Sequence, residues 1–335
     1  MGRPTIIDVA TAAGVSKGAV SFALNGRPGI SEETRRRILA TAEDLGWTPS
    51  ARARALSSSR SHAVGLVLAR PPEVLSVDAF FPAFIAGLET ALSARGHALL
   101  LQVAEHDDLP TYRRLAQEAR VDGVILTDLR VDDERPALLE ELGLPCVLIG
   151  PELSYRSFAT QSAVWHDDAE GIRSVVRHLV ELGHTHIAHV AGPQNLVHGR
   201  SRRRAARRPR VEADFSAESG ARSMAELLQL ADRPTAVVFA NDLMATAGLS
   251  LALSRGISVP GEISVTGFDD IELAAHLQPS LTTVTTDVLA WGRAAATRLL
   301  ELVDHQPPTP HDLPDSRLVV RSSTGPRDDR HHPPR

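Results

Sequence analysis

Hydrophobic positions in the first 48 residues recur at helical spacing in three short segments. The apolar residues of segment 6–13 lead into Gly14, where glycine permits a tight turn. Ser16 then stands where a helix N-cap is expected, ahead of a second segment that begins at Lys17. A third segment follows Ser31, which is also a typical N-cap, and its face carries Ile38, Leu39, Ala42 and Leu45. This pattern predicts a helix, a turn and a second helix, with a third helix closing the core.

From Ala63 onward, apolar runs typical of buried strands alternate with amphipathic segments. The first series of expected strands is 63–69, 98–103, 123–127 and 146–150, and helices are expected at 83–95, 111–120 and 134–142. In the second series, strands are expected at 186–192, 236–240 and 262–268, and helices at 167–183, 217–231 and 242–256. Two successive α/β units of this kind predict two parallel sheets, with ligand bound between them beyond the carboxyl ends of the strands.

The helix-turn-helix pattern indicates DNA binding, because the second helix of such a pair enters the major groove. Lys17, Gly18 and Phe22 face away from Val20 and Leu24 and are the candidates for base contact. Charge agrees: residues 1–62 hold nine Lys and Arg against five Asp and Glu, whereas the rest of the chain is acidic. A basic DNA end on an acidic body favours contact with phosphates at that end alone.

Residues 5 to 57 resemble the lac repressor and galactose repressor family of bacterial transcription regulators. The resemblance rests on D-V-A-x-x-A-G-V-S and V-S-x-x-L-N in the head, and on P-S-A-x-A-R-x-L after it; it extends through most of the chain. The family implies a hinge helix that orders when two copies pair in the minor groove, each inserting a leucine at the central base step. Leu56 occupies that position, although a flexible linker with chance Ala and Leu content is the alternative. The DNA-binding candidates are Thr5, Ser16, Lys17, Gly18, Ser21, Phe22, Asn25, Ser50, Arg52, Arg54 and Leu56.

The resemblance also implies a domain plan. The expected fold class is α/β: a three-helix head (1–48), a hinge and linker (49–61), a two-lobe core resembling periplasmic sugar-binding proteins (62–326) and a disordered tail (327–335). Lobe 1 is expected to take residues 62–164 and 287–314, and lobe 2 residues 165–286 and 315–326.

Polar residues at the expected strand ends match family positions that line an effector cleft between these lobes. The effector-binding candidates are Phe80, Phe81, Thr127, Arg202, Phe215, Asn241 and Asp269. An Arg fork and a carboxylate can hold neighbouring sugar hydroxyls, and an aromatic ring can cover an apolar sugar face. Helix capping is the alternative for Asn241 and Asp269, and core packing is the alternative for Phe80 and Phe81.

Two departures from the family pattern stand out. Gly18 and Phe22 replace residues that usually contact bases, so Lys17 becomes the expected donor to guanine. The interval between Arg202 and Phe215 is about ten residues shorter than the resemblance implies. The stretch 200–210 holds seven Arg, with Ala205 and Ala206 as its apolar residues. Three interpretations are open: a loop shortened by selection, an added basic surface, or a deletion that damages lobe 2 and weakens effector binding. Shortening or deletion is favoured, because a charge run is usually solvated.

The remaining chemistry argues against other classes of protein. The single Cys146 excludes an internal disulfide and lies in an apolar run typical of a buried strand. His184, His186 and His189 alternate along a strand entry, so a metal site is not expected, and neither is a cofactor. Asp269 and Asp270 are adjacent without an acid partner, and no nucleophile elbow or phosphate-binding glycine motif is present, so an enzyme is not expected.

The start of the chain has no secretion signal, which favours the cytoplasm. The tail lacks apolar heptads, which favours a homodimer over a tetramer. The sequence thus predicts a homodimeric DNA-binding transcription regulator, a repressor of a two-fold symmetric operator controlled by a small-molecule effector, expected to be a sugar. The alternative is a small-molecule binding protein whose regulation has lapsed because lobe 2 is shortened around 203–212.

Overall fold

The computed structural model describes residues 4–24, 26–48, 60–71, 75–104, 107–151, 160–206, 210–310 and 313–327. Five DNA-binding candidates lie outside these residues: Asn25, Ser50, Arg52, Arg54 and Leu56. The chain forms two compact units, one comprising residues 1–62 with 119–122 and the other comprising residues 63–118 and 123–335.

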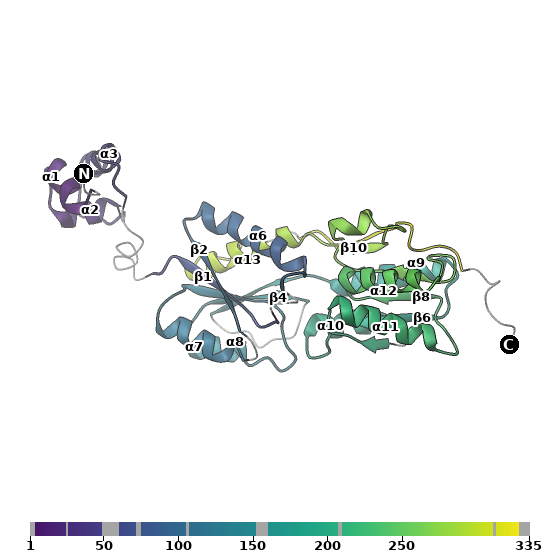
Figure 1. Ribbon diagram of the computed structural model, residues 1–335. Coiled ribbons are helices and arrows are strands. Elements are labelled where there is room, and N and C mark those ends of the chain that lie inside the picture. The colour runs from purple at the N-terminus through teal and green to yellow at the C-terminus, as the bar shows by residue number, and fades with distance from the viewer. Residues whose placement is uncertain are drawn as a thin grey trace. The chain divides into compact units, whose positions relative to one another are not determined.

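The first unit contains the three predicted helices, α1 (Ile6–Ala12), α2 (Lys17–Leu24) and α3 (Glu32–Asp44) (Figure 1). Both predicted caps are present: the Ala19 amide donates to Ser16 Oγ at 3.2 Å, and the Thr34 amide donates to Ser31 Oγ at 3.2 Å. The buried core comprises Val9, Ala10, Ala13, Val20, Ala23, Ile38 and Ala42. Leu39 and Leu45 were wrongly expected on this face, since both are exposed. The three-helix head is therefore confirmed, with a narrower apolar face on α3.

The second unit begins with a five-stranded parallel sheet in the order β2-β1-β3-β4-β5. Its strands are β1 (Ala63–Leu68), β2 (Ala98–Val103), β3 (Gly123–Leu126), β4 (Cys146–Gly150) and β5 (Gln161–Trp165). One face is covered by α6 (Phe80–Ala94) and α13 (Val288–Val303), and the other by α7 (Leu109–Gln117) and α8 (Arg135–Glu141) (Figure 1). Helix α6 begins three residues earlier than predicted, because Pro82 lies in the first turn, where its missing amide costs nothing. We call this sheet with its helices lobe 1.

The second sheet is parallel as well, in the order β7-β6-β8-β9. Its strands are β6 (Ile187–Ala191), β7 (Arg210–Glu212), β8 (Ala236–Phe239) and β9 (Ser264–Thr266), and its helices are α9 (Asp168–Glu181), α10 (Val197–Ala206), α11 (Ala217–Gln229) and α12 (Asp242–Ser254). Alternate strand residues serve opposite faces: Val237 and Phe239 pack with α11 and α12, whereas Ala236 and Val238 pack with α9. We call this sheet with its helices lobe 2. The predicted parallel α/β core is confirmed.

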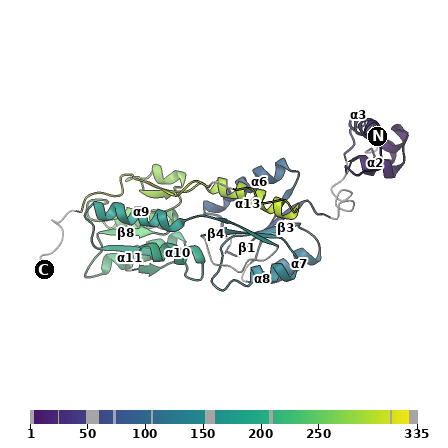
Figure 2. The ribbon, with the colours of Figure 1, turned by 180° about the vertical axis from the view of Figure 1, so that it is seen from behind.

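The chain passes between the lobes three times (Figure 2). It leaves lobe 1 after β5 and enters α9, returns after β10 (Thr283–Thr285) into α13, and crosses again to β11 (Arg317–Val319), which pairs antiparallel with β10. The family resemblance implied crossovers near residues 164, 287 and 315, and the sequence pattern did not predict α13 as a helix. Its buried residues Trp291 and Leu299 join the core of lobe 1.

Helix length and composition bear on membrane insertion. Within the described ranges no single helix is long and apolar enough to cross a bilayer; α1 and α2 meet those criteria only as a pair bent by 102°.

Candidate functional site

A cavity lies where the carboxyl ends of the two sheets meet. It encloses about 560 Å³ of space, part of it open to solvent. In each sheet the first strand of the unit (β1 or β6) lies between its two successors, which creates the crevice where ligands bind in open α/β folds. The lining residues are Arg70, Asp78, Phe80, Thr127, Asp128, Ile149, Gly150, His166, Asp168, His198, Arg202, Phe215, Asn241, Asp269 and Trp291.

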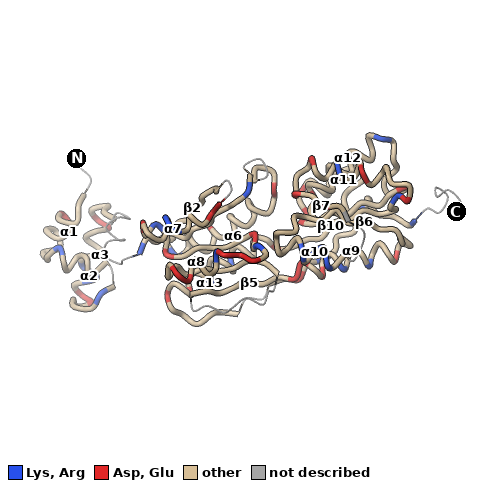
Figure 3. Tube along the Cα trace, turned by 90° about the horizontal axis from the view of Figure 1, so that it is seen from below, with Lys and Arg blue, Asp and Glu red and all other residues tan. Residues whose placement is uncertain are grey.

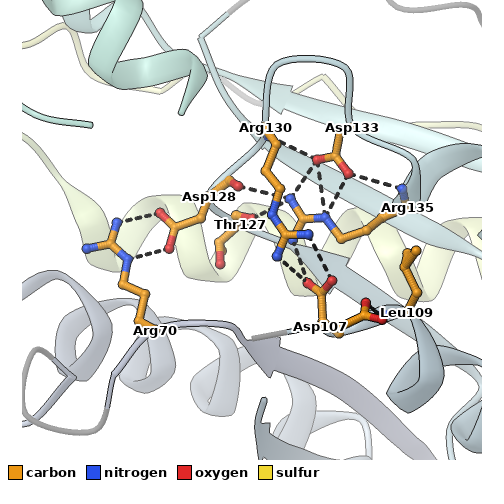
Figure 4. A network of polar contacts seen from close by, with 9 residues as sticks. Arg70, Asp107, Leu109, Thr127, Asp128, Arg130, Asp133 and Arg135 are labelled. Carbon is orange, nitrogen blue, oxygen red and sulfur yellow. Dashed lines mark hydrogen bonds and ion pairs between the residues drawn. The ribbon is translucent and has the colours of Figure 1, made fainter. Parts of the chain in front are cut away.

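On the lobe 1 side, an arginine and a carboxylate flank the crevice between β1 and β3. Arg70 follows β1 and donates from Nε and Nη2 to both oxygens of Asp128, which follows β3, at 2.5 and 2.6 Å (Figure 4). A third bond joins Arg70 Nη1 to Asp78 at 3.2 Å. Burial alone would raise the pKa of Asp128, but the charge and hydrogen bonds of Arg70 outweigh it and lower that pKa to about 2. The pair is therefore ionised and rigid at neutral pH.

On the lobe 2 side, Arg202 of α10 makes a second buried pair with Asp168 of α9. Nε and Nη2 of Arg202 lie 3.0 Å from the same carboxylate oxygen, Nη1 donates to the Ala240 carbonyl at 2.7 Å, and the guanidinium lies 3.8 Å from the ring centre of Phe268. Burial opposes ionisation of Asp168, but the charge of Arg202 outweighs it and holds the pKa of Asp168 well below its usual value. This cluster ties α9, α10 and the end of β8 together behind the cavity.

Aromatic and imidazole rings complete the walls. His166, directly after β5, stacks on Trp291 of α13 with ring centres 3.7 Å apart and planes 8° apart. His166 Nδ1 also lies 2.9 Å from Asp168. Within the described residues, Trp291 Nε1 is buried without a hydrogen-bond partner.

The opposite wall is Phe215, whose ring stacks on His198 and lies 5.3 Å from the Arg70 guanidinium. Gly192 makes room for this ring, since a Cβ there would approach Phe215 to 2.1 Å. Burial lowers the pKa of His198 to about 4, so its imidazole is neutral at pH 7.

Asp269 supplies a carboxyl group that has no salt bridge within the described residues. Its backbone has φ 113°, which asparagine and aspartate tolerate better than most side chains. Burial raises its pKa well above the usual value, and although Arg202 opposes this, Asp242, Asp78 and Asp168 add to it. A protonated carboxyl group can donate a hydrogen bond to a ligand hydroxyl.

Six of the seven predicted effector-binding residues line the cavity: Phe80, Thr127, Arg202, Phe215, Asn241 and Asp269. Phe81 does not line it, because its ring is 2% exposed and packs in the lobe 1 core. The capping alternative also holds for Asn241, which accepts from the Met244 amide at 2.9 Å and donates to the Phe215 carbonyl at 3.1 Å.

Several lining residues were missed by the sequence analysis, including Arg70, Asp128, His166 and Trp291. The first three lie within two residues of the ends of strands β1, β3 and β5, and this position was the available signal.

The arginine-rich segment forms a helix followed by a strand. Helix α10 continues to Ala206, which is buried, and β7 pairs with β6 from Arg210 onward. Between residues 196 and 206 and between 210 and 215, no large apolar side chain is among the exposed ones. The described residues therefore do not support the interpretation of a deletion that damages lobe 2. Arg202 is buried against Asp168, the Ala240 carbonyl and the Phe268 ring. It therefore occupies a packed position in α10 where an apolar side chain was expected.

Blue segments mark the basic residues along α9 and α10 in Figure 3. Within segment 200–210, Arg202 is paired with Asp168. Arg200 and Arg203 donate to the backbone carbonyl and the side-chain oxygen of Gln194. The basic-surface interpretation thus has part of its charge neutralised, that of Arg202.

The head presents one exposed face of α2. Lys17 and Gly18 are exposed, Phe22 is 37% exposed and Ser21 is half-buried. Phe22 also covers the turn, since a Cβ at Gly29 would lie 3.2 Å from its ring. Ser16 is engaged as the α2 cap and Thr5 donates to Asp8 from both its amide and Oγ1 at 2.8 Å, so both candidates also stabilise helix starts.

Arg35 of α3 holds this face in position. Its Nη1 donates to the carbonyls of Ala23 and Phe22 at 2.8 and 3.2 Å, and its Nη2 donates to the Arg27 carbonyl at 2.8 Å. These groups lie at the end of α2, where carbonyls lack helical partners and a cation is favoured. The second helix is thus fixed against the third.

Other reactive groups serve structure. The described residues contain no cluster of three or more His, Cys, Asp or Glu arranged to hold a metal ion. His184 instead contacts Thr235 and the Gly325 carbonyl at 2.9 and 3.1 Å. Cys146 is buried in β4, as predicted, and burial raises the pKa of its thiol to about 12.

The interlobe cavity, with its ion pairs and aromatic rings, can hold and orient a polar molecule by hydrogen bonds, ion pairs and aromatic faces.

Comparison with known proteins gives consistent results over the whole chain. The profile of "bacterial regulatory proteins, lacI family" matches residues 5–50, and that of "periplasmic binding protein-like domain" matches residues 176–324. The transcriptional regulator CelR of Thermobifida fusca is 34% identical over 338 residues, covering 96% of this chain and 98% of the relative. The transcriptional repressor PurR of Aliivibrio fischeri is 32% identical, covering 96% and 99%.

Solved structures agree. A complex of the regulator CelR with cellobiose has a TM-score of 0.71 at 32% identity and covers 96% of this chain and all of that one. The lac repressor dimer bound to operator and the anti-inducer ONPF has a TM-score of 0.79 at 26% identity, covering 97% and 100%.

Proposed function

The chain belongs to the lacI family of bacterial regulatory proteins. We propose that it represses transcription as a homodimer, and that a sugar bound in the interlobe cavity controls its affinity for a two-fold symmetric operator. One observation carries this proposal: the same chain contains a helix-turn-helix head with an exposed α2 face and a core whose cavity is built from ion pairs and aromatic rings. The alternative of lapsed regulation loses its basis, because lobe 2 is packed around α10.

For the head, we propose that Lys17 donates to a base and that Gly18, Ser21 and Phe22 lie beside it in the major groove. Thr5, Ser16 and Asn25 are proposed to contact phosphates. In the hinge, Leu56 is proposed as the minor-groove wedge, flanked by Ser50, Arg52 and Arg54. Repression requires access to the chromosome, so we propose a cytoplasmic location.

For the effector, we propose contacts from Phe80, Thr127, Arg202, Phe215, Asn241 and Asp269. These residues come from both lobes, so a ligand bound among them stabilises one lobe arrangement over another. The lobes also touch through backbone: the Val131 amide donates to the Asn195 carbonyl at 2.9 Å, and the Val197 amide to the Leu129 carbonyl at 2.8 Å. A ligand that changes this contact changes the spacing of two hinges in a dimer and hence operator affinity. Catalysis forms no part of the proposal. The proposed lobe limits are those given by the resemblance, with changes near 62, 164, 287 and 315.

For the dimer, the edge strand β2 offers a surface. Leu101 and Val103 are 47% and 50% exposed and stand two residues apart, so they share one face of the strand. An exposed apolar edge invites pairing with a second copy.

The test uses the full chain. An operator is selected from random DNA, and its dissociation constant is measured by fluorescence anisotropy with and without sugars, cellobiose first. We expect a two-fold symmetric site and a sugar that changes its affinity at least about tenfold, or about 1.4 kcal/mol. Absence of any preferred site contradicts the proposed repressor.

A further inference from the structure

Every guanidinium that lines the interlobe cavity already has a carboxylate partner. Arg70 is engaged by Asp128 and by Asp78, and Arg202 is engaged by Asp168. Lysine cannot supply a further cation, because the only lysine in the sequence is Lys17 in the head.

The two imidazoles of the cavity add no uncompensated positive charge. His198 is neutral at pH 7, since burial lowers its pKa to about 4. His166 Nδ1 lies 2.9 Å from the Asp168 carboxylate, so this imidazole already has an anionic partner. Among the lining residues described, an anionic ligand therefore meets no cation that it could claim without displacing a buried carboxylate, and such displacement leaves a charge unpaired.

Asp269 makes the balance still less favourable to anions. The cavity holds four carboxyl groups, Asp78, Asp128, Asp168 and Asp269, against two guanidinium groups. When Asp269 is ionised it repels a neighbouring anion, and when it is protonated it contributes a neutral donor. Neither state supplies positive charge.

Neutral ligands find suitable partners in the same walls. The Trp291 ring is 3% exposed, lines the cavity, and its Nε1 is buried without a partner in the described chain. An indole N–H donates well to a hydroxyl oxygen. The rings of Phe80 and Phe215 provide apolar faces for the C–H surface of a sugar ring.

Building on the proposed function, we infer that the effector is an uncharged polyhydroxy compound and that sugar acids and sugar phosphates are rejected, because both guanidinium groups of the cavity are already paired. This deepens the proposed function by naming the charge class of the ligand.

The experiment is isothermal titration calorimetry of the full-length protein at pH 7 and constant ionic strength. The probes are matched sets: glucose, glucuronate and glucose 6-phosphate; galactose, galacturonate and galactose 6-phosphate; and cellobiose. We expect a neutral probe to bind and its anionic counterparts to bind at least about tenfold more weakly. An anionic probe that binds as tightly as its neutral counterpart overturns the inference while leaving a sugar-controlled repressor intact. If the protein binds the selected operator but none of the probes at about 10 mM, the proposal of a sugar effector is contradicted, and the inference is contradicted with it.

Discussion

Replacing Arg202 by methionine should expose how much lobe 2 depends on the buried pair with Asp168. Methionine keeps the apolar stem but removes the charge, so Asp168, which is fully buried, loses its main partner. The lost bonds to Asp168 and to the Ala240 carbonyl, together with the contact over Phe268, belong to a class of change that costs about 3–5 kcal/mol. For a unit of this size, that corresponds to a fall in melting temperature on the order of 10 °C.

The stability loss in this variant should depend on pH through the pKa of Asp168. In the unmodified protein the pKa of Asp168 is depressed, so its contribution to stability is present above pH 4 and is lost only at lower pH. Without Arg202, burial is no longer outweighed and the pKa of Asp168 rises. The variant can then bind a proton on Asp168 between pH 7 and pH 4, which relieves the unpaired charge. The stability difference from the unmodified protein should therefore be largest at pH 7 and shrink toward pH 4.

Thermal melts of the full chain at pH 7 and pH 4.5, followed by circular dichroism, measure both effects. Arg204→Met is the matched control, because Arg204 is exposed on the same helix. Equal melting temperatures for the two variants, or an Arg202→Met loss that does not change with pH, would refute the reasoning about the buried pair.

Four further outcomes are expected in the head and hinge. Lys17→Ala should weaken the best operator by about 1–3 kcal/mol and relax sequence preference; equal losses on specific and random DNA at matched salt would show that Lys17 contacts only backbone. Gly18→Ala should stabilise α2 by about 1 kcal/mol in a head-resolved melt, since the added Cβ would lie 3.7 Å from its nearest neighbour; a lower melting temperature contradicts this. Arg35→Met should destabilise the head by about 1–3 kcal/mol without changing which sequence is preferred, and a changed preference in operator selection argues against a bracing role. Leu56→Ala should reduce operator affinity and bending but leave sugar affinity unchanged, and an unaltered DNA bend removes Leu56 from the wedge role.

Local signals explain what could be predicted. Caps such as Ser16 and Ser31 act within three residues, so a short pattern suffices to identify the helices they begin. Strand alternation and length identified the parallel sheets. Because ligands bind at strand ends, the position of Asn241 and Asp269 agreed with the family resemblance in naming them as lining residues.

Tertiary pairing explains what could not be predicted. Arg70 and Asp128 are 58 positions apart and meet only because β1 and β3 are neighbours in the sheet. Arg202 was predicted to contact the effector, but its burial against Asp168, 34 positions earlier, was not predicted. Phe81 and Phe80 are adjacent, yet one packs in the core and the other reaches the cavity, since helix rotation separates them by about 100°.

The most direct test of the central claim is the reciprocity between sugar and operator. The dissociation constant of the selected operator is measured at zero and saturating sugar, and that of the sugar is measured with and without operator, all on the full chain in one buffer. An effector-controlled repressor predicts that the two ratios are equal and at least about tenfold, because both report one coupling free energy. A sugar that binds the cavity but leaves operator affinity unchanged would contradict it.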